Sequence, residues 1–170
     1  PYGRSLEYCT RILKSEGLLF INCFEANLIG SEGTFMEKVR LGVIGTGRLG
    51  GFHASKAAAN PEVDFIGVYD ACESTRKKIA SQYDVRDFSS LDELLPFVDA
   101  VIVATPSIYH AEVGVQILAA GKHLLMEKPV TTTSKSAQEL TRLADRQGVV
   151  FQVGHVEQHD PAWRAAMEHL

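Results

Sequence analysis

Residues 39–50 read VRLGVIGTGRLG, an apolar run that leads directly into a Gly-x-Gly-x-x-Gly motif. Val39–Ile44 has the apolar, β-branched composition of a buried strand. A helix-like stretch, Arg48–Ala59, begins inside the motif, so the glycines occupy a tight turn between strand and helix. A second strand-like run, Val63–Tyr69, ends beside Asp70, about 20 residues beyond the last glycine. This order of a strand, a glycine loop, a helix, a second strand and an acidic residue predicts a unit that binds a dinucleotide.

The same alternation of short apolar runs and longer amphipathic stretches continues along the chain. It predicts an α/β fold, a doubly wound, mostly parallel Rossmann sheet in three α/β/α layers. Ser89, Ser90, Gly121 and Gly148 stand where helices are expected to begin or end. Further strands are expected at 100–104, 123–126 and 149–153, with a weaker one at 85–88, and further helices at 73–83, 108–120 and 134–147, with a turn or two at 91–95.

The residues of the glycine motif are candidates for binding a pyrophosphate. The first glycine permits the tight turn, the second lets the backbone approach the phosphates, and the third lets the helix pack closely on the strands. The start of the helix adds free N–H groups and a partial positive charge. The alternative is that the glycines serve only the turn and the packing. The candidates are Gly45, Thr46, Gly47, Arg48, Leu49 and Gly50.

Asp70, at the end of the second strand, predicts the choice of cofactor. A carboxylate there can accept hydrogen bonds from the ribose hydroxyls of adenosine, and its charge would repel a 2′-phosphate. NAD(H) is therefore favoured over NADP(H). Arg76 follows six positions later and could pair with a 2′-phosphate, although the surface of a helix is its expected place.

Charge and hydropathy argue against two classes of partner. There are 17 Lys and Arg against 21 Asp and Glu, a formal net charge of −4, without a dense basic cluster, so nucleic acid is not expected as a partner. The apolar run at 18–21 is far shorter than the roughly 20 residues of a membrane span, and it lacks a clean cleavage site for a signal peptide. We therefore expect a cytoplasmic protein.

The cysteines and histidines show no metal-binding spacing. Cys9, Cys23 and Cys72 are odd in number and far apart, which fits neither a disulfide framework nor a zinc site. We expect reduced, semi-buried thiols.

Residues 1–35 stand outside the α/β pattern, because they show neither sustained helical nor strand periodicity. Met36 stands just before the first strand, where doubly wound domains commonly begin. We expect Met36 to be the natural start and the preceding segment to be a non-native or disordered extension; the alternative is a genuine N-terminal extension. The predicted dinucleotide-binding domain is 36–153, and 154–170 would begin a linker and a second domain.

Several motifs now occur in a fixed order: GTGRLG followed by His53, ATP at 104–106 followed by His110, and AAGKH at 119–123 leading to EKP at 127–129. In this order they resemble the Gfo/Idh/MocA oxidoreductases, named for glucose-fructose oxidoreductase and inositol dehydrogenase. The resemblance covers about residues 38–170. A further run, GHVE at 154–157, resembles members that act on nucleotide-linked sugars, although their usual continuation RFNP is replaced here by QHDP.

The resemblance implies roles for particular residues. Lys128 would hydrogen-bond the substrate hydroxyl and favour the developing alkoxide. Pro129 would fix the turn through a cis bond. Glu127 would be a partner of the cofactor or of the lysine, the alternative being a solvated turn acid. The loop on the nicotinamide side would comprise Ala104, Thr105, Pro106 and His110, and His155 would lie on the substrate side, whereas His53, His123, His159 and His169 are expected to be structural or exposed.

The resemblance also implies a reaction. The chain would be the N-terminal part of an NAD(P)-dependent enzyme that moves hydride between nicotinamide and a secondary alcohol or ketone of a sugar, nucleotide sugar or cyclitol. Family enzymes carry a second domain with a proton-transferring Asp and His, so this chain alone is expected to be inactive and the full-length enzyme to be a homo-oligomer. The alternatives are a non-catalytic dinucleotide-binding module and a biliverdin-type reductase on the same fold.

Overall fold

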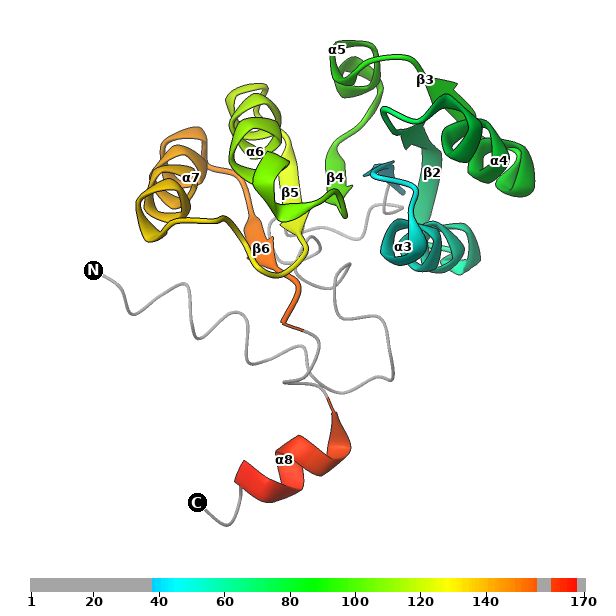
Figure 1. The fold of residues 1–170 in the computed structure, drawn as a ribbon. Coiled ribbons are helices and arrows are strands. Elements are labelled where there is room, and N and C mark those ends of the chain that lie inside the picture. Colours follow the sequence, from blue (N-terminus) through cyan, green and yellow to red (C-terminus); the bar gives the residue numbers. More distant parts are fainter. Residues whose placement is uncertain (1–37, 156–159, 168–170) are drawn as a thin grey trace, which may run out of the picture. The chain divides into compact units, whose positions relative to one another are not determined.

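The computed structural model describes residues 38–155 and 160–167. Helices and strands alternate through this part of the chain (Figure 1), as the sequence predicts. The strands are β1 (Val39–Ile44), β2 (Val63–Tyr69), β3 (Arg86–Phe88), β4 (Ala100–Val103), β5 (His123–Met126) and β6 (Phe151–Val153). The helices are α3 (Arg48–Ala59), α4 (Glu73–Tyr83), α5 (Leu91–Leu94), α6 (His110–Ala119), α7 (Ser134–Gln147) and α8 (Pro161–Met167), with short 3-10 turns at Leu95–Phe97 and Ser107–Tyr109.

The strands form one sheet in the order β3-β2-β1-β4-β5-β6, and every pair is parallel. The order reverses at β1, which pairs with β2 on one side and with β4 on the other. At their carboxyl ends Ile44 stands opposite Tyr69 and Val103. Ligands of doubly wound sheets bind at such a switch point, so the fold places a binding crevice directly beyond Ile44.

Two helical layers cover the sheet. On one face α5, α6 and α7 bury a cluster of apolar side chains against the sheet (Figure 1). On the other face α3 contacts β1, β2 and α4. Small residues let α3 approach closely, since Ala54 and Ala57 are fully or almost fully buried. The crossover connections are right-handed and run in two directions along the sheet, so the helices that connect strands in the two directions lie on opposite faces of the sheet.

The predicted boundaries differ from the structure by a few residues. The helix expected at 108–120 begins at His110, because Pro106 precedes a 3-10 turn rather than the helix itself. The weak strand at 85–88 begins at Arg86, and the last strand begins at Phe151 instead of 149. Gly121 and Gly148 both have positive φ, as expected of residues that end helices.

Within the segment 154–170, which is expected to begin a linker, α8 spans Pro161–Met167. The predicted extension at 1–35 lies outside the described residues. None of the helices in the described ranges combines the length and the apolar character needed to span a bilayer.

Candidate functional site

The glycine loop connects β1 to α3 at the switch point. Gly45 has a φ of +83°, and a Cβ on it would lie 2.8 Å from the backbone of Ala104. A Cβ on Gly50 would lie 1.6 Å from the Gly45 carbonyl oxygen. These two glycines are therefore required by the packing of the turn itself.

Gly47 differs from the other two, because a Cβ there would meet no atom of the described residues within 4 Å. It is exposed and stands at the N-cap of α3, where no side chain caps the helix and the first turn carries no acid. The open space over Gly47 and the uncapped N–H groups fit an anion such as a pyrophosphate.

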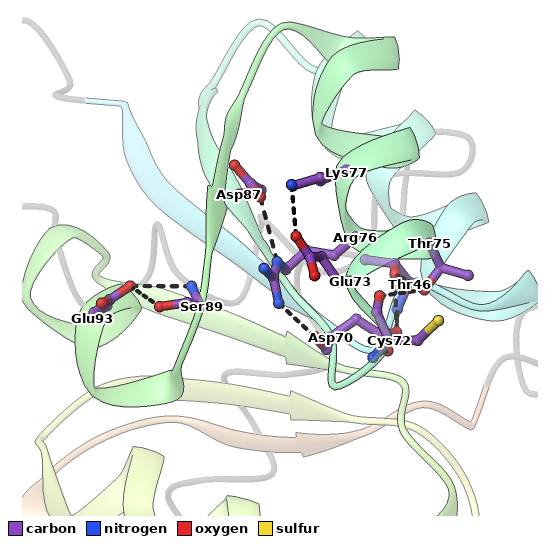
Figure 2. A network of polar contacts seen from close by, with 10 residues as sticks. All are labelled: Thr46, Asp70, Cys72, Glu73, Thr75, Arg76, Lys77, Asp87, Ser89 and Glu93. Atoms are coloured by element: carbon purple, nitrogen blue, oxygen red, sulfur yellow. Dashed lines mark hydrogen bonds and ion pairs between the residues drawn. The ribbon is translucent and has the colours of Figure 1, made fainter.

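Asp70, just beyond β2, is fastened to the glycine loop (Figure 2). Its Oδ2 accepts hydrogen bonds from the Thr46 backbone N–H at 2.5 Å and from the Thr46 hydroxyl at 2.9 Å. Its Oδ1 accepts the Cys72 N–H at 2.8 Å. The Thr46 hydroxyl also lies 3.2 Å from that of Thr75 on α4. The acid predicted to bind ribose thus also organises the loop predicted to bind phosphate.

Arg76 reaches back from α4 toward the end of β2 (Figure 2). Its Nη1 donates to the Asp70 carbonyl oxygen at 3.1 Å, and its Nε forms an ion pair with Asp87 Oδ2 at 3.5 Å. Only 11% of the side chain is exposed, so the expectation of a solvated surface arginine is wrong. The crossover of α4 over β3 brings Asp87 to it, a contact that local sequence does not reveal.

Cys72 precedes α4 and is exposed, which corrects the expectation of a semi-buried thiol at this position. Its sulfur lies 3.3 Å from the Ser74 hydroxyl. Hydrogen bonds from the Ser74 side chain and from Thr75 lower the pKa of the Cys72 thiol to about 7. Cys9 and Cys23 lie outside the described residues.

The turn that follows β5 contains Glu127, Lys128 and Pro129, and the Lys128–Pro129 peptide bond is cis, as expected. Lys128 is exposed at the carboxyl end of the strand. Glu127 is only 6% exposed, so the alternative of a solvated turn acid is wrong. Its Oε1 lies 2.8 Å from His53 Nε2, and its Oε2 accepts the Lys128 backbone N–H at 3.2 Å.

His110 is 1% exposed at the start of α6 and connects two loops. Its Nε2 lies 2.8 Å from the Thr105 carbonyl oxygen, and its Nδ1 lies 2.9 Å from the Pro129 carbonyl oxygen. Carbonyl oxygens only accept hydrogen bonds, so the ring nitrogen that carries the hydrogen is the donor to its neighbouring carbonyl. His110 thereby holds the loop after β4 against the turn that carries Lys128.

The remaining candidates surround the same end of the sheet. The Thr105 hydroxyl is buried without a hydrogen-bond partner in the described part of the chain. Ala104 is half-buried, Pro106 is exposed, and His155 is exposed directly after β6. Arg48 and Leu49 are exposed at the start of α3. His159 and His169 are not among the described residues.

His53 contacts Glu127 in this site, whereas the sequence leads only to the expectation of a structural or exposed position for it. A signal was present, because His53 follows Gly50 by three residues and therefore shares its helix face, which packs toward the sheet. His123 is structural, as expected: its Nδ1 accepts the Val150 N–H at 3.0 Å. The described residues contain no group of three or more His, Cys, Asp or Glu that could hold a metal ion.

Comparison with known proteins agrees with this geometry. Residues 39–155 match the family model GFO_IDH_MocA, an oxidoreductase family with an NAD-binding Rossmann fold. The UDP-N-acetylglucosamine 3-dehydrogenase of Acidithiobacillus ferrooxidans is 39% identical over 127 residues, covering 75% of this chain and 40% of the relative. A solved structure of that enzyme, GnnA, has a TM-score of 0.74 at 36% identity and covers 79% of this chain and 44% of that one.

Two further structures contain a cofactor. GenD2 from gentamicin A biosynthesis, in complex with NAD, has a TM-score of 0.68 at 35% identity, over 74% of this chain and 37% of that one. KijD10, a 3-ketoreductase from Actinomadura kijaniata with NADP and TDP-benzene, has a TM-score of 0.73 at 27% identity, over 78% of this chain and 42% of that one.

The chain spans about 40% of the length of the relatives it matches. The family model matches the whole sheet and the turn after β5. The chain therefore belongs to the Gfo/Idh/MocA oxidoreductase family, whose model describes an NAD-binding Rossmann fold.

Proposed function

We propose that this chain is the cofactor-binding part of an NAD(P)-dependent dehydrogenase or reductase that acts on a secondary alcohol or ketone of a sugar-type substrate. The observation that carries the proposal is the meeting of the open Gly47 cradle and the Lys128 turn at the carboxyl end of one parallel sheet. Ligands of such sheets bind at this end.

The residues present fit a nicotinamide dinucleotide. The space over Gly47 and the N-terminus of α3 would receive the pyrophosphate, and Asp70 would receive the adenosine ribose. The loop of Ala104, Thr105 and Pro106, held by His110, would border the nicotinamide half. When bound, the dinucleotide supplies the hydride acceptor or donor.

Lys128 is the proposed catalytic residue. Its ammonium group would donate a hydrogen bond to the substrate oxygen and stabilise the negative charge that develops there during oxidation of the alcohol. Glu127 and His110 would hold the backbone of this turn, since they contact the Lys128 N–H and the Pro129 carbonyl oxygen. His155 is proposed to contact substrate, because it is exposed at the end of β6, the strand next to β5.

NAD(H) is the proposed preference over NADP(H). An ionised carboxylate accepts about four hydrogen bonds, and Asp70 accepts three from the described residues, which leaves capacity for a ribose hydroxyl. Arg76 is engaged by the Asp70 carbonyl and by Asp87, so it is not available for a 2′-phosphate in this conformation. The lowered pKa of Cys72, about 7, adds partial negative charge near the same place.

A nucleotide sugar is the substrate class that we propose within this family. The dehydrogenase that is 39% identical is named for UDP-N-acetylglucosamine, and the GHVE run at 154–157 resembles that of members acting on nucleotide-linked sugars. We propose that the dinucleotide domain spans 36–153 and that a second domain, in a homo-oligomer, completes the substrate site; the relatives are about 2.5 times as long as the region they share with this chain.

The test is hydride transfer by the whole protein with UDP-N-acetylglucosamine and NAD⁺, followed at 340 nm. Lys128→Ala should lower kcat/KM at least about a hundredfold and leave the NADH dissociation constant within about threefold. The matched control is Lys135→Ala, an exposed lysine on α7. Unchanged turnover in Lys128→Ala would refute its catalytic role. NADH binding without turnover of any sugar would favour the non-catalytic module, and turnover of biliverdin would favour the other alternative.

A further inference from the structure

Glu127 is a buried carboxylate that contacts an imidazole from a different part of the fold. It follows β5 and is 6% exposed, whereas His53 lies in the second turn of α3 with 21% of its side chain exposed. The distance from His53 Nε2 to Glu127 Oε1 is 2.8 Å. A carboxylate at this depth requires a donor, since burying an unpaired charge costs several kcal/mol. His53 supplies that donor.

The carboxylate is enclosed on its other sides as well. Its Oε2 accepts the Lys128 backbone N–H at 3.2 Å. A Cβ on Gly154, after β6, would lie 3.2 Å from the Glu127 carboxyl carbon, so the segment that leads to His155 passes directly against it. Glu127 therefore connects α3, the turn after β5 and the end of β6.

This connection joins the two halves of the proposed site. The helix that carries His53 is the one whose N-terminus would receive the pyrophosphate, and the carboxylate that His53 contacts also holds the amide of Lys128. On the far side of the lysine, His110 holds the Pro129 carbonyl oxygen. A histidine therefore supports the backbone on each side of Lys128: His53 through Glu127, and His110 at Pro129. Of these two histidines, His53 is the one that lies on the proposed phosphate-binding helix.

We propose that His53 is a positioning residue for Lys128, acting through Glu127: it fixes the turn after β5 relative to the helix that binds the cofactor phosphates. The inference rests on the proposed function of Lys128. The contact needs only an N–H at the position of His53 Nε2, which the Nε2–H tautomer of the imidazole supplies and which a glutamine side chain can reach. A residue that serves only the packing of α3 would not show this requirement.

Steady-state kinetics of the whole protein test the proposal with His53→Ala, His53→Gln and the control Ser55→Ala, which is exposed on the same helix. His53→Ala should lower kcat about 10- to 100-fold, the size of effect that a misplaced catalytic group produces, while KM for NAD⁺ changes less than about threefold. His53→Gln should recover to within about fivefold of wild type, and Ser55→Ala should match wild type. If His53→Ala does not fold, His53→Leu replaces it, because Leu keeps the volume without a donor.

Amide hydrogen exchange in this chain gives a readout that needs no substrate. The Lys128 N–H should exchange about tenfold faster in His53→Leu than in wild type, and at about the wild-type rate in His53→Gln. Wild-type kcat in folded His53→Ala, or a Gln variant as impaired as the Ala variant, would overturn the role of His53 while leaving the proposed function intact. A wild-type protein that transfers no hydride refutes the proposed function instead, and the exchange rates then decide whether His53 positions the turn.

Discussion

Thr46 and Asp70 are joined by two hydrogen bonds to a single oxygen, from the Thr46 backbone N–H at 2.5 Å and from its hydroxyl at 2.9 Å. Thr46 is only 5% exposed. The pair fastens the end of β2 to the glycine loop across 24 residues of sequence. The acid that would bind ribose and the loop that would bind phosphate therefore form one preorganised unit, which lowers the ordering cost of binding a dinucleotide.

Thr46→Val removes the hydroxyl and keeps the shape of the side chain. The free energy of unfolding should fall by roughly 1–2 kcal/mol, because a buried bond to a charged group is lost, and NADH should bind more weakly. Urea unfolding and NADH fluorescence titration measure the two effects. The control is Thr141→Val on the exposed face of α7, where the hydroxyl contacts only its own helix. Equal stability of the Thr46 and Thr141 variants would contradict the proposed clamp.

Gly50 and Gly47 make a matched pair, because the same methyl group should lower stability at the first position and weaken cofactor binding at the second. Gly50→Ala places Cβ 1.6 Å from the Gly45 carbonyl oxygen and should destabilise the fold by about 3 kcal/mol or more. The added methyl group of Gly47→Ala meets no atom within 4 Å in residues 38–155 and 160–167, so stability should change by less than about 1 kcal/mol. It should nevertheless weaken NADH binding, because the methyl group enters the phosphate cradle. Undiminished affinity in Gly47→Ala would place the dinucleotide elsewhere.

His123 should make stability depend on pH. Burial lowers the pKa of this imidazole below its ordinary value, with the negative charge of Asp99 opposing the shift. Its Nδ1 accepts the Val150 N–H, so the folded state favours the neutral ring. The unfolded chain binds the proton more tightly, at a pKa of about 6.5. The contribution of His123 is therefore complete above that pH and is lost as the pH falls toward the lowered value.

The variant His123→Asn tests this dependence of stability on pH. The oxygen of the asparagine side chain can still accept the Val150 N–H, but the side chain does not titrate in this pH range. Urea unfolding at several pH values should show a smaller loss of stability just below pH 6.5 in the variant than in wild type. Parallel profiles for wild type and His123→Asn would show that burial does not favour the neutral ring.

Cys72 should react at lower pH than an ordinary thiol. Its pKa is lowered to about 7 by hydrogen bonds, first from the Ser74 side chain and then from Thr75. Because the thiolate is the nucleophile, alkylation by iodoacetamide should rise with pH around an inflection near 7. Peptide mapping by mass spectrometry follows Cys72 separately from Cys9 and Cys23. Ser74→Ala should move the inflection to higher pH, and an unmoved inflection would remove Ser74 as the cause.

Local patterns were sufficient for the fold. The glycine motif, the Val-rich runs and the glycines after helices gave the element order and a parallel sheet, since each depends on neighbouring residues. The predicted ends of helices and strands differ from the structure where a turn competes with a regular element. At Pro106 the chain makes a 3-10 turn before α6, because proline fixes its own φ and lacks an N–H.

The side-chain pairs of the site could not be predicted in this way. His53 and Glu127 are 74 residues apart, and Arg76 meets Asp87 only because α4 crosses back over β3. Such contacts depend on three-dimensional packing, which a pattern read along one chain does not encode. The exposure of Cys72 has the same origin, since it depends on how the end of β2 turns toward α4 rather than on residue type.

Calorimetric titration of NADH and NADPH into this chain, with its cooperative melting checked first, shows whether the proposed site binds a dinucleotide. We expect the wild-type chain to bind NADH more tightly than NADPH. Asp70→Ala should weaken NADH binding about tenfold or more, because a charged acceptor of the ribose hydroxyls is lost. A folded wild-type chain that binds neither nucleotide would contradict the proposed dinucleotide site. An Asp70→Ala variant with unchanged NADH affinity would contradict the proposed role of Asp70 in that site.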